Sequence, residues 1–400
     1  MRAIDMFDER PTALSKQTPM AWVVLALCGV LWWSCLDSPE GDDCLRIGLL
    51  VQEMPFISQP VIQAVRMAID DANAQGGLEA QDGQRLPIEL FVRSEFETPE
   101  QAVVAIRELI YREKVSAIIG PVLSRHAIPA AAVAEQVGVP MISPGSTHPE
   151  TTAGKRWVFR MVVLDEFQGR VIARFALEDL EASTAAILYE VSDPSGRSIG
   201  EGFRDAFVAA GGEVVASETY TFGDDDFSER LATIHRRDPE VLFLPNPIEQ
   251  AVVQVRLARG LGLDATVLGS DIWAVAKMSR YPELEGAFAF QHWHTSFGTA
   301  SGEAELFSKA FQERHGTAPS DMAAMAWDAA GLILAAAQAG SSSETIRQGL
   351  ARMEGYRGAS GEMTFAGRGG NPPKAAIILG IRNGQVELAE YFPASDVPEP

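Results

Sequence analysis

The sequence predicts an α/β protein made of two doubly wound, Rossmann-like lobes that share a multi-strand hinge. From residue 45 onward, short segments rich in β-branched residues alternate with amphipathic helical segments, as in parallel sheets covered by helices. The alternation occurs in two series of similar length. The chain has 400 residues, which is more than one ordinary core needs and suggests about two domains of roughly 150 residues each.

The first series predicts the sheet of one lobe together with its helices. Strands are expected at residues 45–51, 87–93, 115–119 and 140–143. Helices are expected at residues 60–75, 99–112 and 126–137. The first helix is expected to stop at Gly76-Gly77, because glycine is typical of helix ends.

The second series begins after an extended segment at residues 157–163. Its strands are expected at residues 184–189, 213–221, 241–244 and 266–269. Its helices are expected at residues 168–180, 198–210, 227–237 and 249–260. Sheets of this kind bind ligands outside the carboxyl ends of their strands.

The remainder of the chain is too short for a third lobe and is expected to return to the first two. It predicts three helices and one hairpin, near residues 303–315, 322–339, 343–353 and 375–392. The hairpin turns at Asn383-Gly384, a pair favoured in two-residue turns. Lobe 1 is therefore expected to contain residues 45–163 and about 292–372, and lobe 2 residues 164–291 and about 373–395.

Residues 1–44 are expected to be a leader and linker outside the fold. The apolar run at residues 21–33 is too short to span a bilayer comfortably and has the length of a signal peptide. Cys35 follows Ser34 in an arrangement that resembles a lipoprotein box, so Cys35 is a candidate for lipidation. The protein is expected to be exported, and then to be either periplasmic or anchored to a membrane by its lipidated N-terminus. Translation from Met20 instead of Met1, or retention of the segment as an anchor, stays open.

Charge and composition argue against several other classes of protein. The net charge of −21 would repel a polyanion, so no nucleic-acid partner is expected. All three cysteines lie in or just after the leader, which excludes a disulfide or a cysteine-ligated metal within the folded lobes. His292 and His294 could share one face of a strand, but with no third ligand nearby a hinge or surface role is expected and no metal.

No cofactor or enzymatic activity is expected either. The chain has no Walker motif, and the glycines of residues 260–263 are interpreted as a helix end. Ser124 and His126 stand two residues apart, so they would not face each other on a helix, and no G-x-S-x-G elbow is present.

Two strand ends carry the pattern of an anion site. The run Ser143–Glu150 follows a short apolar strand, and Thr147 and Glu150 have the spacing of a capping box at a helix start. Residues 118–124 form a second apolar strand, a Gly-Pro turn and a hydroxyl residue, Ser124, at an expected N-cap. Backbone N–H groups at helix starts favour anions, so these ends, side by side, would converge on a carboxylate. The alternative for each is an ordinary helix cap.

Four segments resemble the type I periplasmic solute-binding proteins of the branched-chain amino acid (Leu/Ile/Val-binding) ABC transporter family. They are residues 68–78, with the pattern D-x-N-A-x-G-G, and residues 98–102, 119–124 and 142–147. The resemblance implies an exported, monomeric protein that captures an amino acid or related small carboxylate by hinge closure. It also implies delivery to an ABC permease in the membrane. The alternative is a ligand-sensing receptor module of the same fold.

The resemblance also implies the ligand contacts of lobe 1. The Ser124 hydroxyl would bind the ligand carboxylate. The Gly145 backbone and the Thr147 backbone and hydroxyl would hold the carboxylate and the ammonium. Ser146, between them in the same loop, is also expected to contact the ligand. Met54 and Phe56 are expected to add apolar surface.

In lobe 2, Asp271 would face the ligand ammonium, unless it caps a helix that begins at Ile272. Trp273 would form an aromatic wall of the pocket or pack in the core. Ser195 and Pro247 stand where family members supply aromatic residues. Ser195 is therefore expected to contact the ligand, which can be larger than leucine or differently shaped.

Overall fold

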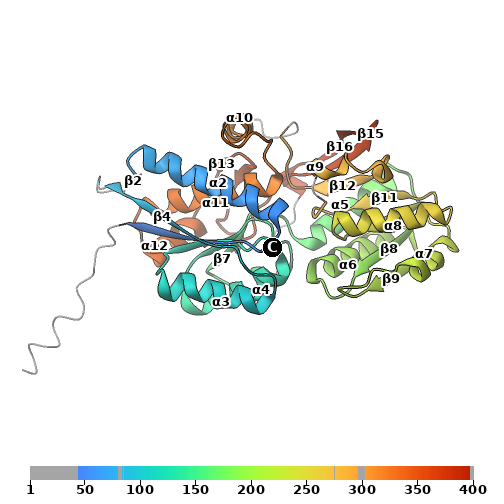
Figure 1. Ribbon diagram of the computed structural model, residues 1–400, viewed down its shortest axis with the longest axis horizontal. Coiled ribbons are helices and arrows are strands. Elements are labelled where there is room, and N and C mark those ends of the chain that lie inside the picture. The colour runs from blue at the N-terminus through green and yellow to red at the C-terminus, as the bar shows by residue number, and fades with distance from the viewer. Residues whose placement is uncertain (1–43, 80–82, 84, 274, 296–301, 397–400) are drawn as a thin grey trace, which may run out of the picture. The chain divides into compact units, whose positions relative to one another are not determined.

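The computed structural model describes residues 44–79, 83, 85–273, 275–295 and 302–396 (Figure 1). The predicted leader lies outside these residues, and so does Cys35. Among the described residues, no helix has the length and apolar character needed to cross a membrane.

The first sheet has five parallel strands in the order β4-β1-β5-β6-β7. These strands are β1 (Leu45–Leu50), β4 (Ile88–Arg93), β5 (Ala117–Ile119), β6 (Met141–Ser143) and β7 (Val158–Arg160). One face of the sheet packs on α2 (Pro55–Ala74) and α11 (Asp321–Ala337). The other face packs on α3 (Pro99–Arg107) and α4 (Ser124–Val137), which lie below the sheet in Figure 1. We call this sheet and its helices lobe 1.

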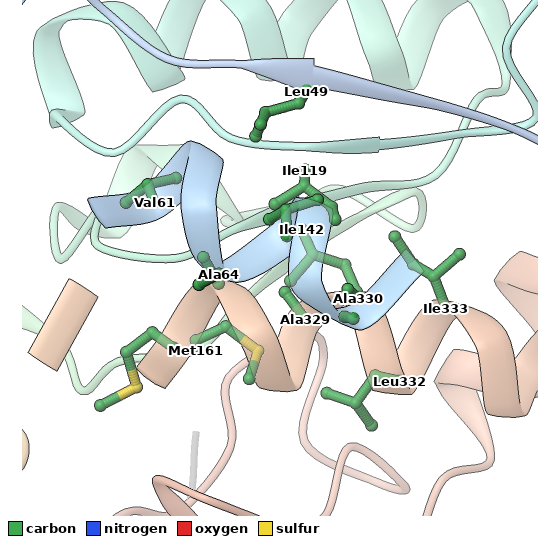
Figure 2. Packing of buried hydrophobic residues seen from close by; sticks show 14 of the residues in the cluster. Leu49, Val61, Ala64, Ile119, Ile142, Met161, Ala329, Ala330, Leu332 and Ile333 are labelled. Carbon is green, nitrogen blue, oxygen red and sulfur yellow. The ribbon is translucent and has the colours of Figure 1, made fainter. Parts of the chain in front are cut away.

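Small side chains allow the helices of lobe 1 to approach each other and the sheet. Figure 2 shows Ala64 of α2 close to α11, where Ala329 and Ala330 lie, with Ile119 and Ile142 of the sheet above them. All five side chains are fully buried. Three more helices complete the lobe: the π-helical turn Glu108–Arg112 that continues α3, then α10 (Glu303–His315) and α12 (Ser343–Ala351).

The second sheet has seven strands in the order β16-β15-β12-β11-β10-β8-β9. They are β8 (Thr184–Glu190), β9 (Glu213–Tyr220), β10 (Val241–Leu244), β11 (Thr266–Gly269), β12 (Phe288–Gln291), β15 (Ala376–Arg382) and β16 (Gln385–Phe392). β8 to β12 are parallel to one another, and β15 and β16 are antiparallel additions. The helices α5 (Asp165–Glu178) and α6 (Pro194–Ala209) cover one face, and α7 (Ser228–His235) and α8 (Ile248–Gly260) cover the other. We call this sheet and its helices lobe 2.

The chain passes between the lobes at three places, which follow from the order of the elements. It leaves lobe 1 between β7 and α5, returns between β12 and α10, and crosses again before β15. The predicted fold class, two doubly wound lobes with several crossings, agrees with this architecture. The individual boundaries near residues 163, 292 and 372 stay predictions.

A buried polar network holds the chain just before the third crossing. Asp328 of α11 accepts hydrogen bonds from the backbone N–H groups of Ala359 and Ser360, both at 2.7 Å, and from the Ser360 hydroxyl. Lys374 Nζ donates to the Ser360 carbonyl and hydroxyl at 2.8 and 2.6 Å. Burial lowers the pKa of Lys374 to about 8, an effect that the nearby Asp328 opposes.

Several predicted element boundaries were wrong. The helix expected from residue 60 begins at Pro55, because Pro60 is accommodated inside its early turns. The helix expected after Thr147 is one 3₁₀ turn, Pro149–Thr151, whose cap is the His148 side chain. Ser124 is the first residue of α4 and not its cap, which is Leu123.

Two short hairpins were not predicted, because their strands have only two or three residues. They are β2 (Leu78–Glu79) with β3 (Arg85–Leu86), and β13 (Tyr356–Gly358) with β14 (Gly361–Met363). The hairpin predicted at Asn383-Gly384 is confirmed, and both turn residues have positive φ angles of 53° and 69°.

Helices α5 and α6 pack so closely that Gly169 has no room for a side chain. A Cβ atom at Gly169 would lie 2.5 Å from the Phe203 backbone nitrogen and 2.7 Å from the Gly202 carbonyl carbon. We expect Gly169→Ala to lower the free energy of unfolding by about 1–3 kcal/mol, because backbone must move. The measurement is denaturant unfolding.

Gly260 provides a matched control at the exposed end of α8. A Cβ atom there would have no neighbour within 4 Å. Gly260→Ala should leave stability unchanged or raise it by at most about 1 kcal/mol. Equal stability of Gly169→Ala and the native protein would contradict the packing argument.

Candidate functional site

A cavity of about 640 Å³ lies between the lobes, at the carboxyl ends of strands from both sheets. From lobe 1 it is lined by residues that follow β5 and β6, including Ser124, Gly145 and Thr147. From lobe 2 it is lined by residues that follow β8, β10 and β11, including Ser195 and Asp271. This is where doubly wound sheets place their ligands.

Hydroxyl groups from both lobes meet at Ser124. Its Oγ accepts hydrogen bonds from the Ser146 hydroxyl at 2.9 Å and from the Ser195 hydroxyl of α6 at 2.7 Å. The Thr147 hydroxyl lies 3.4 Å from that of Ser195. Because the lone pairs of Ser124 are used by these donors, its own O–H remains available to donate into the cavity.

Ser146 supports Ser124 and does not itself line the cavity. The side chain is fully buried, and its hydroxyl also lies 2.6 Å from that of Thr151. Its backbone N–H donates to the Ser143 hydroxyl at 3.0 Å. Ser146 is therefore buried beside the cavity and bonded to Ser124, and its ligand contact stays a prediction.

The side chains of Met322 and Val122 leave no room for a side chain at Gly145. A Cβ atom there would lie 2.6 Å from Met322 Sδ and 2.7 Å from Val122 Cγ1. Absence of a side chain lets the backbone of this loop approach the cavity closely.

Arg160, at the end of β7, holds the loop that contains Ser146 from behind. Its Nη1 donates to the Ser146 carbonyl at 2.8 Å, and its Nη2 donates to the His148 carbonyl at 2.8 Å and to Thr152 Oγ1 at 2.6 Å. The side chain is fully buried. This residue was not predicted, because a single arginine in a short strand has no distinguishing pattern.

Asp271 lines the cavity and is held by a histidine. Its Oδ2 lies 3.0 Å from Nε2 of His292, and only 11% of its side chain is exposed. Its backbone N–H donates to Gln168 Oε1 at 3.1 Å. No helix begins at Ile272: the Trp273 N–H bonds to the Ser270 carbonyl at 3.1 Å and closes a turn. The capping alternative therefore does not apply.

Trp273 packs in the core of lobe 2 and does not line the cavity. Its side chain is fully buried, and Nε1 donates to the Asn246 carbonyl at 3.0 Å. Its ring occupies the space that a side chain at Gly269 would need. The expected aromatic wall is thus absent at this position, and the core alternative applies.

The carboxyl of Asp321 also lines the cavity. It was not predicted, because an aspartate directly after the N-cap residue Ser320 is common at the start of a helix. Its Oδ1 accepts from the Met322 N–H at 2.7 Å, and its buried Oδ2 has no partner among the described residues. Burial raises the pKa of Asp321 to about 6, with His292 opposing this shift and Asp271 adding to it.

Asp165 lies behind the cavity at the first crossing between the lobes. Its backbone N–H donates to the Thr147 carbonyl at 3.1 Å. The side chain is fully buried, and neither oxygen has hydrogen-bond geometry to a described group, although the Thr147 hydroxyl is near. Burial raises the pKa of Asp165 well above its usual range.

Within the described ranges, no group of three or more His, Cys, Asp or Glu side chains could hold a metal ion. His292 is engaged with Asp271, while His294 lines the cavity and has a pKa lowered by burial.

Comparison with known proteins finds relatives that are named as amino-acid binding proteins. An amino acid binding protein of Pseudomonas aeruginosa is 30% identical over 205 residues, 51% of this chain and 53% of the relative. The Leu/Ile/Val-binding protein of Escherichia coli is 25% identical over 249 residues, 62% of this chain and 66% of the relative. The chain spans about half the length of the first curated relatives it matches.

Solved structures match over most of the chain. A branched-chain amino acid transporter substrate binding protein from Streptococcus pneumoniae, in complex with isoleucine, has a TM-score of 0.80 and 27% identity, covering 88% of this chain and 99% of that one. A leucine binding protein from Thermotoga maritima has a TM-score of 0.81 at 24% identity, with the same coverage, and shows the fold alone. The fold class predicted from the sequence is confirmed. A family model described as periplasmic binding protein matches residues 52–385, and the chain belongs to that family.

Proposed function

We propose that this exported protein captures an amino acid or a related small carboxylate between its lobes and delivers it to an ABC importer. The observation that carries the proposal is the meeting of hydroxyls from both lobes at Ser124, in a cavity that also contains Asp271. One ligand could therefore contact both lobes at once.

The carboxylate half of the site is provided by lobe 1. Helix α4 begins at Ser124, and its cap residue Leu123 has no side-chain acceptor for the first-turn N–H groups. These donors and the positive end of the helix dipole favour an anion. The Ser124 hydroxyl and the backbone at Gly145 and Thr147 line the same part of the cavity.

Asp271 provides the ammonium half from lobe 2. A buried cation without a partner is very costly, so a zwitterionic ligand needs a carboxylate at this depth. The contact with His292 fixes the orientation of Asp271 and leaves its second oxygen for the ligand.

Contacts across the cleft support closure as the capture step. Ser195 of lobe 2 bonds to Ser124, and Lys277 Nζ lies 3.6 Å from the ring centroid of Phe56 in lobe 1. Lys277 also pairs with Glu249 of α8. A ligand shifts the protein toward the closed form only by its extra contacts with both lobes, and this site supplies them.

The rest of the cavity suits an apolar body larger than a small side chain. Phe56, Val122 and Ile199 line it together with Ile272. Ser195 and Pro247 also line it where relatives would place aromatic rings, so they leave volume for the ligand. The relatives named above as binding amino acids support the same ligand class.

Binding should raise the thermal stability of the purified protein, because a ligand specific for the folded state stabilises it by mass action. At a ligand concentration 100 times Kd the gain is about 2.7 kcal/mol, which corresponds to several degrees in Tm. A screen of amino acids, amides and small aromatic acids by differential scanning fluorimetry would measure it. No shift with any of them would contradict solute capture.

Ser124→Ala should weaken carboxylate binding about tenfold, since it removes one hydrogen bond to a charged group. Isothermal titration calorimetry measures the change. Ser308→Ala, on α10 and outside the cavity, is the control and should bind normally. Unchanged affinity in Ser124→Ala would exclude its hydroxyl from the site.

Asp271→Asn should weaken amino-acid binding about 10- to 100-fold and leave an analogue without the amino group unaffected. The comparison uses leucine and 4-methylpentanoate, with the exposed Asp264→Asn as control. Equal losses for both ligands would show that Asp271 does not contact the ammonium.

Asp321 should make the stability of the ligand-free protein depend on pH. Because the folded pKa of about 6 lies above the usual value of 3.8, the stabilising contribution is complete below pH 3.8 and is lost as pH rises through 6. Asp321→Asn should therefore gain on the order of 2 kcal/mol over the native protein at pH 7.5 and almost nothing at pH 4. Thermal unfolding at both pH values tests this, and an equal difference at both would contradict it.

A further inference from the structure

Arg160 makes an unusual set of contacts for a fully buried arginine. Its Nη1 and Nη2 donate to the carbonyls of Ser146 and His148, each at 2.8 Å, and Nη2 also contacts the Pro149 carbonyl at 3.4 Å. The fourth acceptor is the Thr152 hydroxyl, at 2.6 Å. All these acceptors belong to the loop that follows β6, the loop of Gly145 and Thr147.

None of these acceptors is charged, so the guanidinium has no ion-pair partner within the described part of the chain. The acidic group that interacts with it electrostatically is Asp165. The Asp165 carboxyl is fully buried near the hydroxyls of Thr147 and Ser198, and burial raises its pKa well above the usual range. Among the described residues, the positive charge of Arg160 is therefore met at hydrogen-bond distance by neutral acceptors alone.

The direction of the loop connects this charge to the cavity. The carbonyls of the loop point back to Arg160, so the peptide dipoles at Ser146 and His148 have their negative ends on the guanidinium. Gly145 and Thr147 of the same loop line the cavity. A buried, uncompensated cation is costly to the protein by itself, and an anionic ligand in front of the loop would offset that cost.

We propose that Arg160 is a positioning residue that orients the loop through its carbonyls and makes the cavity selective for ligands with an anionic head group. This inference rests on the proposed function for the identity of the site. It goes further in assigning the preference for an anion to a residue that does not touch the ligand.

The first test measures selectivity. Affinities of leucine and phenylalanine are compared with those of leucinamide and phenylalaninamide, which keep the ammonium and side chain but lack the carboxylate. Arg160→Gln should weaken binding of the acids at least about tenfold and of the amides at most about threefold, because it removes charge. Arg160→Lys, which keeps the charge, should restore part of the preference. Equal losses for acids and amides would reduce Arg160 to a scaffold and overturn the proposal.

The second test needs no ligand and uses His148, which accepts a hydrogen bond in the same loop. Burial lowers the pKa of His148, and the charges of Arg160 and Arg197 lower it further, against Glu150 and Asp193. In Arg160→Gln the pKa of His148, measured by NMR, should rise, and in the control Arg112→Gln, on the exposed surface, it should not. An unchanged His148 pKa in Arg160→Gln would show that Arg160 has no uncompensated charge and would overturn the proposal.

Asp165→Asn keeps the proposal testable if Arg160→Gln does not fold. If no carboxylate cancels the charge of Arg160, this variant should have the same His148 pKa as the native protein. A lower His148 pKa in Asp165→Asn would show that Asp165 is an ionised counter-charge and would overturn the proposal. If neither these four probes nor any compound of the stability screen binds the native protein, the proposed function fails while the His148 measurements still decide this inference.

Discussion

The parallel strands of both sheets end at the same cavity, and the site depends on this arrangement. The segments that follow these strands carry polar side chains beyond the edge of each sheet. From lobe 1 these turns bring Ser124 and the loop with Thr147, and from lobe 2 they bring Ser195 and Asp271. The cavity therefore combines hydroxyl groups of lobe 1 with carboxyl groups that include Asp271 of lobe 2, and a ligand that contacts both must lie between the lobes.

The charged groups around the cavity have partners of different kinds. The carboxyl of Asp271, which lines the cavity, contacts His292, and burial raises the pKa of the Asp321 carboxyl to about 6. Behind the loop, Arg160 is paired with carbonyls instead of a carboxylate. Low-dielectric surroundings strengthen each of these effects, so small changes in this set of groups should alter which ligand charge is accepted.

The fold was largely predictable because strand and helix periodicity is a local property of the sequence. The place of Ser124, Thr147 and Asp271 at the cavity was also predictable, since each comes shortly after the end of a strand. Arg160 and Asp165 were not, because their importance comes from contacts with a loop about ten to twenty residues away and from complete burial. For Trp273 the prediction of a pocket wall was suggested by its closeness to Asp271 in the sequence. In the structure its ring is buried in the core, in the space left by the missing side chain of Gly269.

The same loop links the ligand site to the hinge. β7 ends at Arg160, and the chain then crosses to lobe 2 and begins α5 at Asp165. Arg160 holds the loop from one side of this crossing, and the Asp165 N–H holds the Thr147 carbonyl from the other. A ligand that contacted Thr147 would therefore also restrict the backbone at this crossing. Because binding and closure share these hydrogen bonds, the loop can act as the element that couples an occupied cavity to the closed form.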